Sequence, residues 1–150
     1  MTEQPKGTKP LSHSAQNQCF GCGPGSPVGL RLEFAVDEDA TVICDAVISN
    51  NYEGPPGYVH GGIIATLLDE AMSKANRARG VTAMTRQMQV DYLHPVHSGK
   101  PIRLVARVTS SEGRKHWTSA ELLSSEGVCL AKATGLFIAI RPRVASPDQN

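Results

Sequence analysis

The sequence has little of several features that mark specific classes of protein. Its 150 residues include only three Phe, three Tyr and one Trp, so nothing indicates a pocket built for an aromatic ligand. The formal net charge is +1 and no run of Lys or Arg occurs, which argues against nucleic acid or an anionic membrane surface as a partner. No apolar stretch approaches the ~20 residues needed to span a bilayer.

The N-terminal segment also lacks the apolar core of a secretory signal. Residues 1–18 are polar, contain prolines and show no periodicity, so they are expected to form a flexible tail. Residues 141–150 are expected to be a second tail. The length then predicts one domain, over residues 19–140, that buries a core without disulfides or metals. We expect a cytoplasmic protein.

Four cysteines occur, and only Cys19 and Cys22 are closely spaced, as C-F-G-C. A structural zinc site usually needs a second pair of ligands, and His13 is the only histidine nearby. A thioredoxin-like redox pair would enter a helix, which the following G-P-G-S-P cannot begin. We therefore expect no metal, and we place the pair in a loop of a protein kept reduced. A Ser–His–Asp hydrolase is not supported either, because no G-x-S-x-G elbow exists.

Hydrophobic periodicity predicts two strands, one long helix and an up-and-down run of four more strands. The helix is expected to begin at Gly61 or Gly62 and to end at Arg79, with Gly80 as its stop. The six strands are expected at 30–34, 40–49, 82–93, 101–110, 115–123 and 128–140. One helix cannot cover both faces of such a sheet, so the fold class is α+β, with pairing of sheets in a symmetric dimer.

The stretch 57–70, G-Y-V-H-G-G-I-I-A-T-L-L-D-E, is either a ligand site or a buried helix with a tight entry turn. Glycines at the start of a helix let a ligand approach unpaired N–H groups. At ~100° per residue, the apolar side chains from Ile64 to Ala75 share one stripe. Glu70 lies on the opposite side, four residues before Lys74, and is predicted to be a solvated surface residue. Asp69 lies at the edge of the apolar stripe, where a carboxylate points to acid–base chemistry.

Three motifs together resemble the hotdog-fold acyl-CoA thioesterases of the phenylacetic-acid-degradation type and their relatives in the thioesterase superfamily. They are V-H-G-G at 59–62, A-T-L-L-D at 65–69, and the strand 85–92 followed by Pro95. The C-x-x-C-G at 19–23, followed by P-x-G-L at 27–30, is similar to a lead-in of one branch of that family. The resemblance covers about residues 19–140 and implies a long central helix wrapped by a roughly six-stranded antiparallel sheet.

The resemblance also implies roles for individual residues. Asp69 matches the catalytic carboxylate, which acts as a general base or as a nucleophile, and His60, Gly61 and Gly62 match the groups that hold the thioester carbonyl. Thr85 matches a residue that holds the nucleophilic water, although its strand parity also allows a solvated face shared with Gln87 and Gln89.

Glu53, Val59 and Arg86 are the candidate substrate-binding residues. In some relatives an Asn stands six residues before the His, where this chain has Gly54 with Glu53 beside it. If Glu53 faces the site, it is expected to assist the base or to raise the pKa of Asp69 by repulsion between like charges.

Within one helix, Gly61 and Asp69 lie ~11–12 Å apart along the axis, too far to act on one thioester carbon. In the family that it resembles, the two come from opposite subunits, which implies a homodimer, or a dimer of dimers, with a composite site. The predicted function is hydrolysis of an acyl-CoA to a free acid and CoA, without a cofactor. The alternatives are a non-hydrolytic acyl-CoA binder and, less favoured, a hotdog hydratase.

Overall fold

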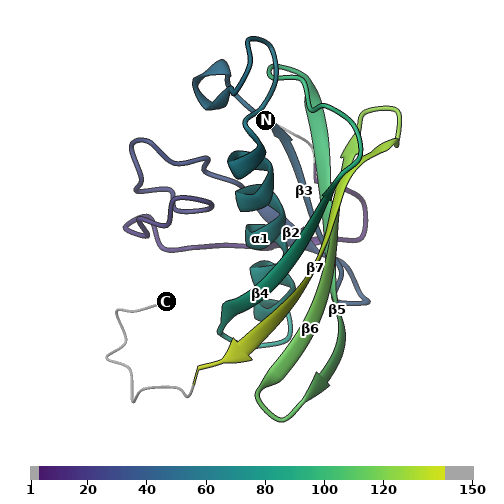
Figure 1. Ribbon diagram of the computed structural model, residues 1–150. Helices are drawn as coiled ribbons and strands as arrows, with labels where there is room; N and C mark the ends of the chain where they lie inside the picture. The colour runs from purple at the N-terminus through teal and green to yellow at the C-terminus, as the bar shows by residue number, and fades with distance from the viewer. Residues whose placement is uncertain (1–3, 141–150) are drawn as a thin grey trace.

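The computed structural model describes residues 4–140 as one long helix packed on a seven-stranded antiparallel sheet (Figure 1). The helix is α1 (Gly61–Arg77), and a single 3₁₀ turn, η1 (Asn50–Tyr52), precedes it. The strands are β1 (Lys9–Leu11), β2 (Phe34–Val36), β3 (Val42–Val47), β4 (Ala83–Tyr92), β5 (Pro101–Glu112), β6 (Lys115–Ser124) and β7 (Cys129–Ala139). Among the described residues, neither helix is both long and apolar enough to cross a membrane.

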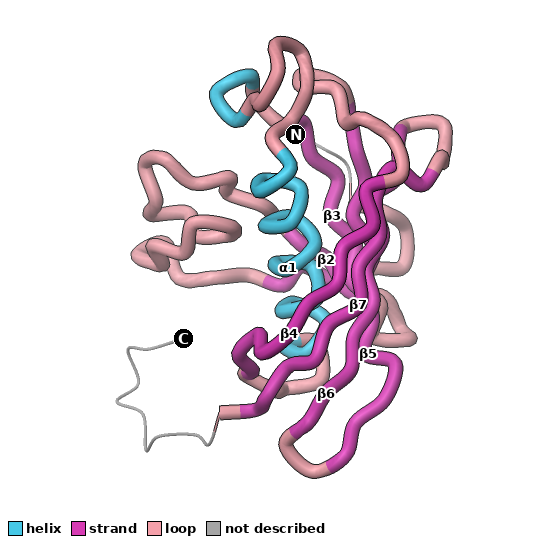
Figure 2. The backbone as a smooth tube through the Cα atoms, in the orientation of Figure 1, coloured by secondary structure: helices cyan, strands magenta, loops and turns pink. Residues whose placement is uncertain are grey.

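The strand order is β1-β2-β3-β5-β6-β7-β4, and each neighbouring pair is antiparallel. The predicted up-and-down order is therefore wrong at one point. Of the four strands that follow the helix, β5, β6 and β7 form a meander. The first of the four, β4, instead pairs with β7 and becomes a sheet edge. This pairing lets the sheet curl around α1, as Figure 2 shows, and it places β4 alongside the helix that precedes it in the chain.

The core lies between the apolar stripe of α1 and the concave face of the sheet. Leu67, Leu68 and Ala71 are completely buried there, together with Leu104 and Phe137 from the strands. Burial of such side chains stabilises the fold by about 1.5–3 kcal/mol for each large apolar residue. The predicted stripe is thus confirmed. The helix ends two residues before the predicted position, and Gly80 follows it with φ +74°.

The segment that precedes β2, residues 4–33, is called the N-terminal lead-in here, and it departs most from the sequence-based expectation. Residues 9–11, predicted to belong to a flexible tail, form β1 and pair with β2. The segment 30–33, predicted as a strand, is irregular, and the strand begins only at Phe34. Arg31 has a positive φ of 50° and interrupts the extended run. The predicted tail at 141–150 lies outside the described residues.

This lead-in covers the side of α1 that faces away from the sheet, so the helix is enclosed by two layers (Figure 1). Lys74, expected on a solvated face, is only 5% exposed. The side chain of Glu70 is 13% exposed and forms an ion pair with Lys74 at 2.9 Å. The prediction that this pair lies in solvent is wrong, because the periodicity of a helix cannot reveal a cover supplied by an irregular loop.

Candidate active site

The first turn of α1 presents one free backbone donor at the protein surface. His60 is the N-cap, and its Nδ1 accepts a hydrogen bond from the Gly62 N–H at 2.9 Å. The N–H groups of Ile63 and Ile64 bond to the His60 carbonyl oxygen. Of the orphan donors that begin every helix, the exposed Gly61 N–H is therefore the one left to bind a ligand.

The cap also fixes the state of the His60 ring. Because Nδ1 accepts a hydrogen bond, the proton of the neutral imidazole is on Nε2, which becomes a second donor beside Gly61. Gly62 was predicted to help hold the thioester oxygen, but its N–H is already bonded to His60. Its role is steric, since a Cβ on Gly62 would lie 3.1 Å from His60 Nδ1.

Tyr92 anchors the same turn to the end of β4. Its hydroxyl donates to the Gly61 carbonyl oxygen at 3.0 Å, and its ring lies 3.7 Å from where a Gly61 Cβ would be. In the sequence Tyr92 is only the last residue of the motif at 85–92, and this contact was not predicted. No local pattern reveals it, because it joins the start of the helix to a strand that is 31 residues later in the chain.

Two turns further along α1, Asp69 and Thr85 form a close pair. The Thr85 hydroxyl donates to Asp69 Oδ1 at 2.6 Å, so the strand and the helix hold the carboxylate together. Partial burial raises the pKa of Asp69 above its ordinary value, the Thr85 hydrogen bond opposes this, and the charge of Glu70 adds a smaller increase. A carboxylate with a raised pKa and a hydroxyl partner is suited to proton transfer.

Thr85 reaches Asp69 because β4 contains a bulge. The register with β7 shifts between Thr85 and Gln87, so that Arg86 is the extra residue. Thr85 then lies opposite the buried Phe137, whereas Gln87 lies opposite Leu136 on the other face. Simple alternation placed Thr85 with Gln87 and Gln89, and the bulge reverses that parity. The open question about Thr85 is thereby resolved in favour of the face that contacts the helix.

The three predicted substrate-binding residues have different surroundings. Val59 is 5% exposed and belongs to the core. Arg86 is exposed at the bulge. Glu53 accepts a hydrogen bond from Ser98 Oγ at 2.7 Å, which lowers its pKa, and no influence of Glu53 on the pKa of Asp69 is found within the chain. Within one chain the groups that shift the pKa of Asp69 do not include Glu53, and a role of Glu53 in a site shared by two subunits stays a prediction.

A second polar cluster lies on the opposite side of α1, where the lead-in meets Glu70. Cys19 Sγ is 3.8 Å from Glu70 Oε2, and Cys22 lies close by. Burial, and then the neighbouring Glu70, raise the pKa of Cys22 to about 12, so it is a thiol at neutral pH. The predicted loop position of both cysteines is confirmed, and all four cysteines of the chain are free. The sequence analysis did not connect Glu70 with them.

Comparison with known proteins identifies the family. The family model described as "Thioesterase superfamily" matches residues 56–131, which is half of the chain. The acyl-coenzyme A thioesterase THEM4 of Xenopus laevis is 37% identical over 91 residues, covering 60% of this chain and 41% of the relative. The chain thus spans about half the length of the curated relatives that it matches.

Solved structures agree with this assignment. The crystal structure of the thioesterase superfamily protein RHA08564 superposes with a TM-score of 0.78 at 30% identity, covering 81% of this chain and 60% of that one. The BH2602 protein of Bacillus halodurans, solved with CoA, gives a TM-score of 0.67 at 28% identity, covering 76% of this chain and 77% of that one. The fold is the hotdog fold that the motifs indicated, with a seventh strand, and the chain belongs to the thioesterase superfamily.

Proposed function

We propose that the protein hydrolyses an acyl-CoA thioester to a free acid and CoA. The observation that carries this proposal is the 2.6 Å hydrogen bond between Thr85 and Asp69. It holds a carboxylate with a raised pKa on the side of α1 that faces β4. The names of the relatives support the class of reaction. The CoA in the structure of BH2602 supports CoA as the carrier.

Asp69 acts as the general base in this scheme. Thr85 orients its carboxylate, and Asp69 takes a proton from the water whose oxygen attacks the thioester carbon. The negative charge on the carbonyl oxygen is stabilised by the Gly61 N–H and by His60 Nε2–H, two donors already fixed by the fold. The carbon–sulfur bond then breaks, and the CoA thiolate leaves and takes up a proton.

We further propose that each site is shared by two subunits of a homodimer, or of a dimer of dimers. Eight residues separate Gly61 from Asp69, or about 12 Å along the helix axis, so one thioester carbon cannot contact both in one chain. The edge strand β4 carries exposed apolar side chains, Met84 at 61% and Tyr92 at 54%. An exposed, ten-residue edge with apolar side chains is a surface suited to pairing with a second copy.

The proposed location is the cytoplasm, as the sequence analysis expected. Four free thiols in the chain suit a reducing compartment.

A thiol-release assay over acyl-CoA chain lengths tests the function. Asp69→Asn keeps the shape of the side chain but removes the base, so the rate is expected to fall by about 10²–10⁴-fold. The matched control is Asp39→Asn, an exposed turn residue far along the chain, which is expected to retain the native rate. Native protein that binds acyl-CoA but releases no thiol would overturn hydrolysis in favour of a non-hydrolytic acyl-CoA binder.

A further inference from the structure

The cluster of Cys19, Cys22 and Glu70 lies outside the proposed active site and has the composition of a metal site. The two thiol sulfurs and a carboxylate oxygen of Glu70 all lie within 4.8 Å of one another. They come from two parts of the chain, the C-F-G-C turn of the lead-in and the outward side of α1. Cys22 is only 4% exposed, so the cluster is enclosed rather than displayed on the surface.

The distance between the Cys19 sulfur and the Glu70 carboxylate is close to that between two ligands of zinc, and the Cys22 sulfur lies within 4.8 Å of both. In a tetrahedral site with Zn–S about 2.3 Å and Zn–O about 2.0 Å, a sulfur and an oxygen ligand lie about 3.5 Å apart. Cys19 Sγ is 3.8 and 3.9 Å from the two oxygens of Glu70. A shift of a few tenths of an ångström therefore brings them to ligand spacing, which needs only small side-chain rotations.

The backbone of the lead-in is shaped to approach Glu70. Gly21, between the two cysteines, packs directly against the Glu70 carboxyl group, because a Cβ there would lie 2.5 Å from Glu70 Oε2 and would displace that side chain. The Gly23 N–H bonds to the Cys19 carbonyl oxygen at 2.8 Å and closes the turn, which holds both thiols on the same side. The absence of a side chain at Gly21 thus allows the two cysteines to lie close to the Glu70 carboxylate.

The neighbouring Lys74 supplies the charge balance. Its Nζ bonds Glu70 Oε1 at 2.9 Å, whereas Oε2 faces Cys19 and Gly21. Two thiolates and one carboxylate carry three negative charges, and Zn²⁺ with the Lys74 ammonium carries three positive charges. A buried group of charges is tolerated when it is paired in this way, and a hydrogen-bonded ligand carboxylate is typical of metal sites.

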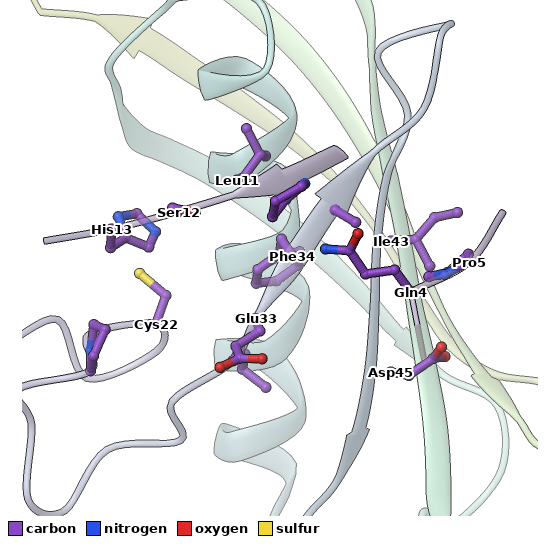
Figure 3. A pocket seen from close by; sticks show the side chains of 14 residues that line it. Gln4, Pro5, Leu11, Ser12, His13, Cys22, Glu33, Phe34, Ile43 and Asp45 are labelled. Atoms are coloured by element: carbon purple, nitrogen blue, oxygen red, sulfur yellow. The ribbon is translucent and has the colours of Figure 1, made fainter. Parts of the chain in front are cut away.

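We propose that Cys19, Cys22 and Glu70 bind a zinc ion that fastens the N-terminal lead-in to α1. Water completes the coordination. Cys22 and His13 line a cavity of about 340 Å³ between the lead-in, β2 and β3, from which that water is supplied (Figure 3). His13 is not a ligand in this arrangement, because its ring nitrogens are not among the ligand atoms that lie within 4.8 Å of one another, and its ring contacts Arg77 instead. The prediction of no metal considered only cysteine and histidine ligands and so omitted Glu70.

Zinc binds cysteine as the thiolate, so binding releases the thiol protons of Cys19 and Cys22, two for each zinc ion. The site lies on a different side of α1 from the Asp69–Thr85 pair, since Asp69 faces β4 and Glu70 faces the lead-in. The ion fastens the lead-in to α1, so its loss is expected to loosen the lead-in without removing Asp69 or Thr85.

Cobalt titration of the full chain tests the site. Protein freed of metal with a chelator and kept reduced is titrated with Co²⁺. We expect a thiolate-to-cobalt charge-transfer band at one ion per chain, with two protons released as Co²⁺ binds. Zn²⁺ then displaces the cobalt and abolishes the band without further release of protons. Cys19→Ser and Cys22→Ser are each expected to remove about half of the band. Cys129→Ser, a half-buried thiol on β7, is the matched control and is expected to leave it unchanged.

Glu70→Gln keeps both sulfurs and is expected to weaken zinc binding by about tenfold or more, because it removes one ligand. Circular dichroism of each variant checks that the fold is retained. The proposal is overturned if reduced native protein gives no charge-transfer band in excess Co²⁺, or if either serine variant keeps the full native band. The proposal is likewise overturned if the purified native protein contains a disulfide between Cys19 and Cys22 and no bound metal.

Discussion

Asp69 and Glu70 are adjacent carboxylates whose surroundings give them opposite chemistry. Asp69 has a hydroxyl partner and no cation, so partial burial raises its pKa. Glu70 has the Lys74 ammonium at 2.9 Å, which neutralises it. A free base and a neutralised structural acid thus occupy neighbouring positions, because successive helical residues point about 100° apart. The sequence alone predicts that Asp69 and Glu70 lie on different sides of the helix. It does not predict that Asp69 contacts Thr85 or that Glu70 contacts the cysteines.

At the residue scale, the proposed role of the Thr85 hydroxyl predicts how activity depends on pH. Its hydrogen bond favours the ionised form of Asp69, so Thr85→Val is expected to raise the pKa of that carboxyl further. The acid limb of the kcat/KM profile then moves to higher pH. The rate on its plateau falls by about tenfold to a hundredfold, the equivalent of one hydrogen bond to a charged group.

Thr85→Ser retains the donor and is the matched control for this change. Its acid limb is expected to stay at the native position. The pH dependence of thiol release measures both variants. An unshifted profile in Thr85→Val would mean that the hydroxyl does not act on the base.

The raised pKa of Asp69 also predicts how stability depends on pH. The folded state holds this proton more tightly than the unfolded state, whose ordinary pKa is 3.8. Ionisation of Asp69 therefore costs stability as pH rises through the folded pKa. Asp69→Asn cannot ionise, and its amide oxygen still accepts from Thr85, so this variant is expected to unfold at a higher temperature than native protein at pH 7.

The gain in Asp69→Asn should shrink as pH falls and vanish below the unfolded pKa, where native Asp69 is protonated in both states. Thermal unfolding at several pH values measures it. A variant that is less stable than native protein at pH 7 would show that burial does not dominate at Asp69. The same data exclude unfolding as the cause of its lost activity.

At the scale of elements, regular periodicity was sufficient for the helix and the five long strands. The stripe from Ile64 to Ala75 and the alternation in β5 each bury one face, and their positions follow directly from the spacing of apolar residues. Irregular features were not predictable in this way. The bulge at Arg86 reverses the parity of Thr85, and no residue type in β4 announces it. β1 is three residues long and contains Pro10, so it has no period to detect.

The stop of α1 gives an element-scale prediction. Gly80 has φ +74°, a conformation that costs an L-residue about 1–2 kcal/mol. Gly80→Ala is therefore expected to lower the free energy of unfolding by about 1 kcal/mol, even though a Cβ there would contact nothing within 4 Å. Urea denaturation measures the loss as a lower midpoint with an unchanged slope.

Gly80→Asn is the matched comparison, because Asn tolerates the left-handed region, and its loss is expected to be smaller. Neither variant touches the Asp69–Thr85 pair, so both should retain the native rate of thiol release. Equal stability of native protein and Gly80→Ala would mean that the positive φ at position 80 is not needed to end the helix.

At the scale of the whole molecule, one chain places the oxyanion donors and the base on the same helix but out of each other's reach. The fold was predictable because the hydrophobic pattern demands one helix against one sheet. The second layer was not predictable, since the lead-in is held by specific contacts such as Arg77 to the Ser12 carbonyl oxygen at 2.6 Å. The assembly is the remaining step. Under the proposed mechanism, the rise of the helix keeps Gly61 and Asp69 too far apart to act on one thioester, so the proposed site needs a second subunit.

Mixing two inactive variants tests that requirement directly. His60→Ala removes one oxyanion donor and Asp69→Asn removes the base, so each homodimer has two defective sites. In a mixed dimer, the Asp69 of one variant faces the His60 of the other, and one of the two sites is intact. An equal mixture with free exchange of subunits contains half mixed dimers, so about one quarter of the native activity should return. Mass spectrometry verifies that exchange has occurred. If mixed dimers form and thiol release does not recover, each site must be built within a single chain, and the composite arrangement is wrong.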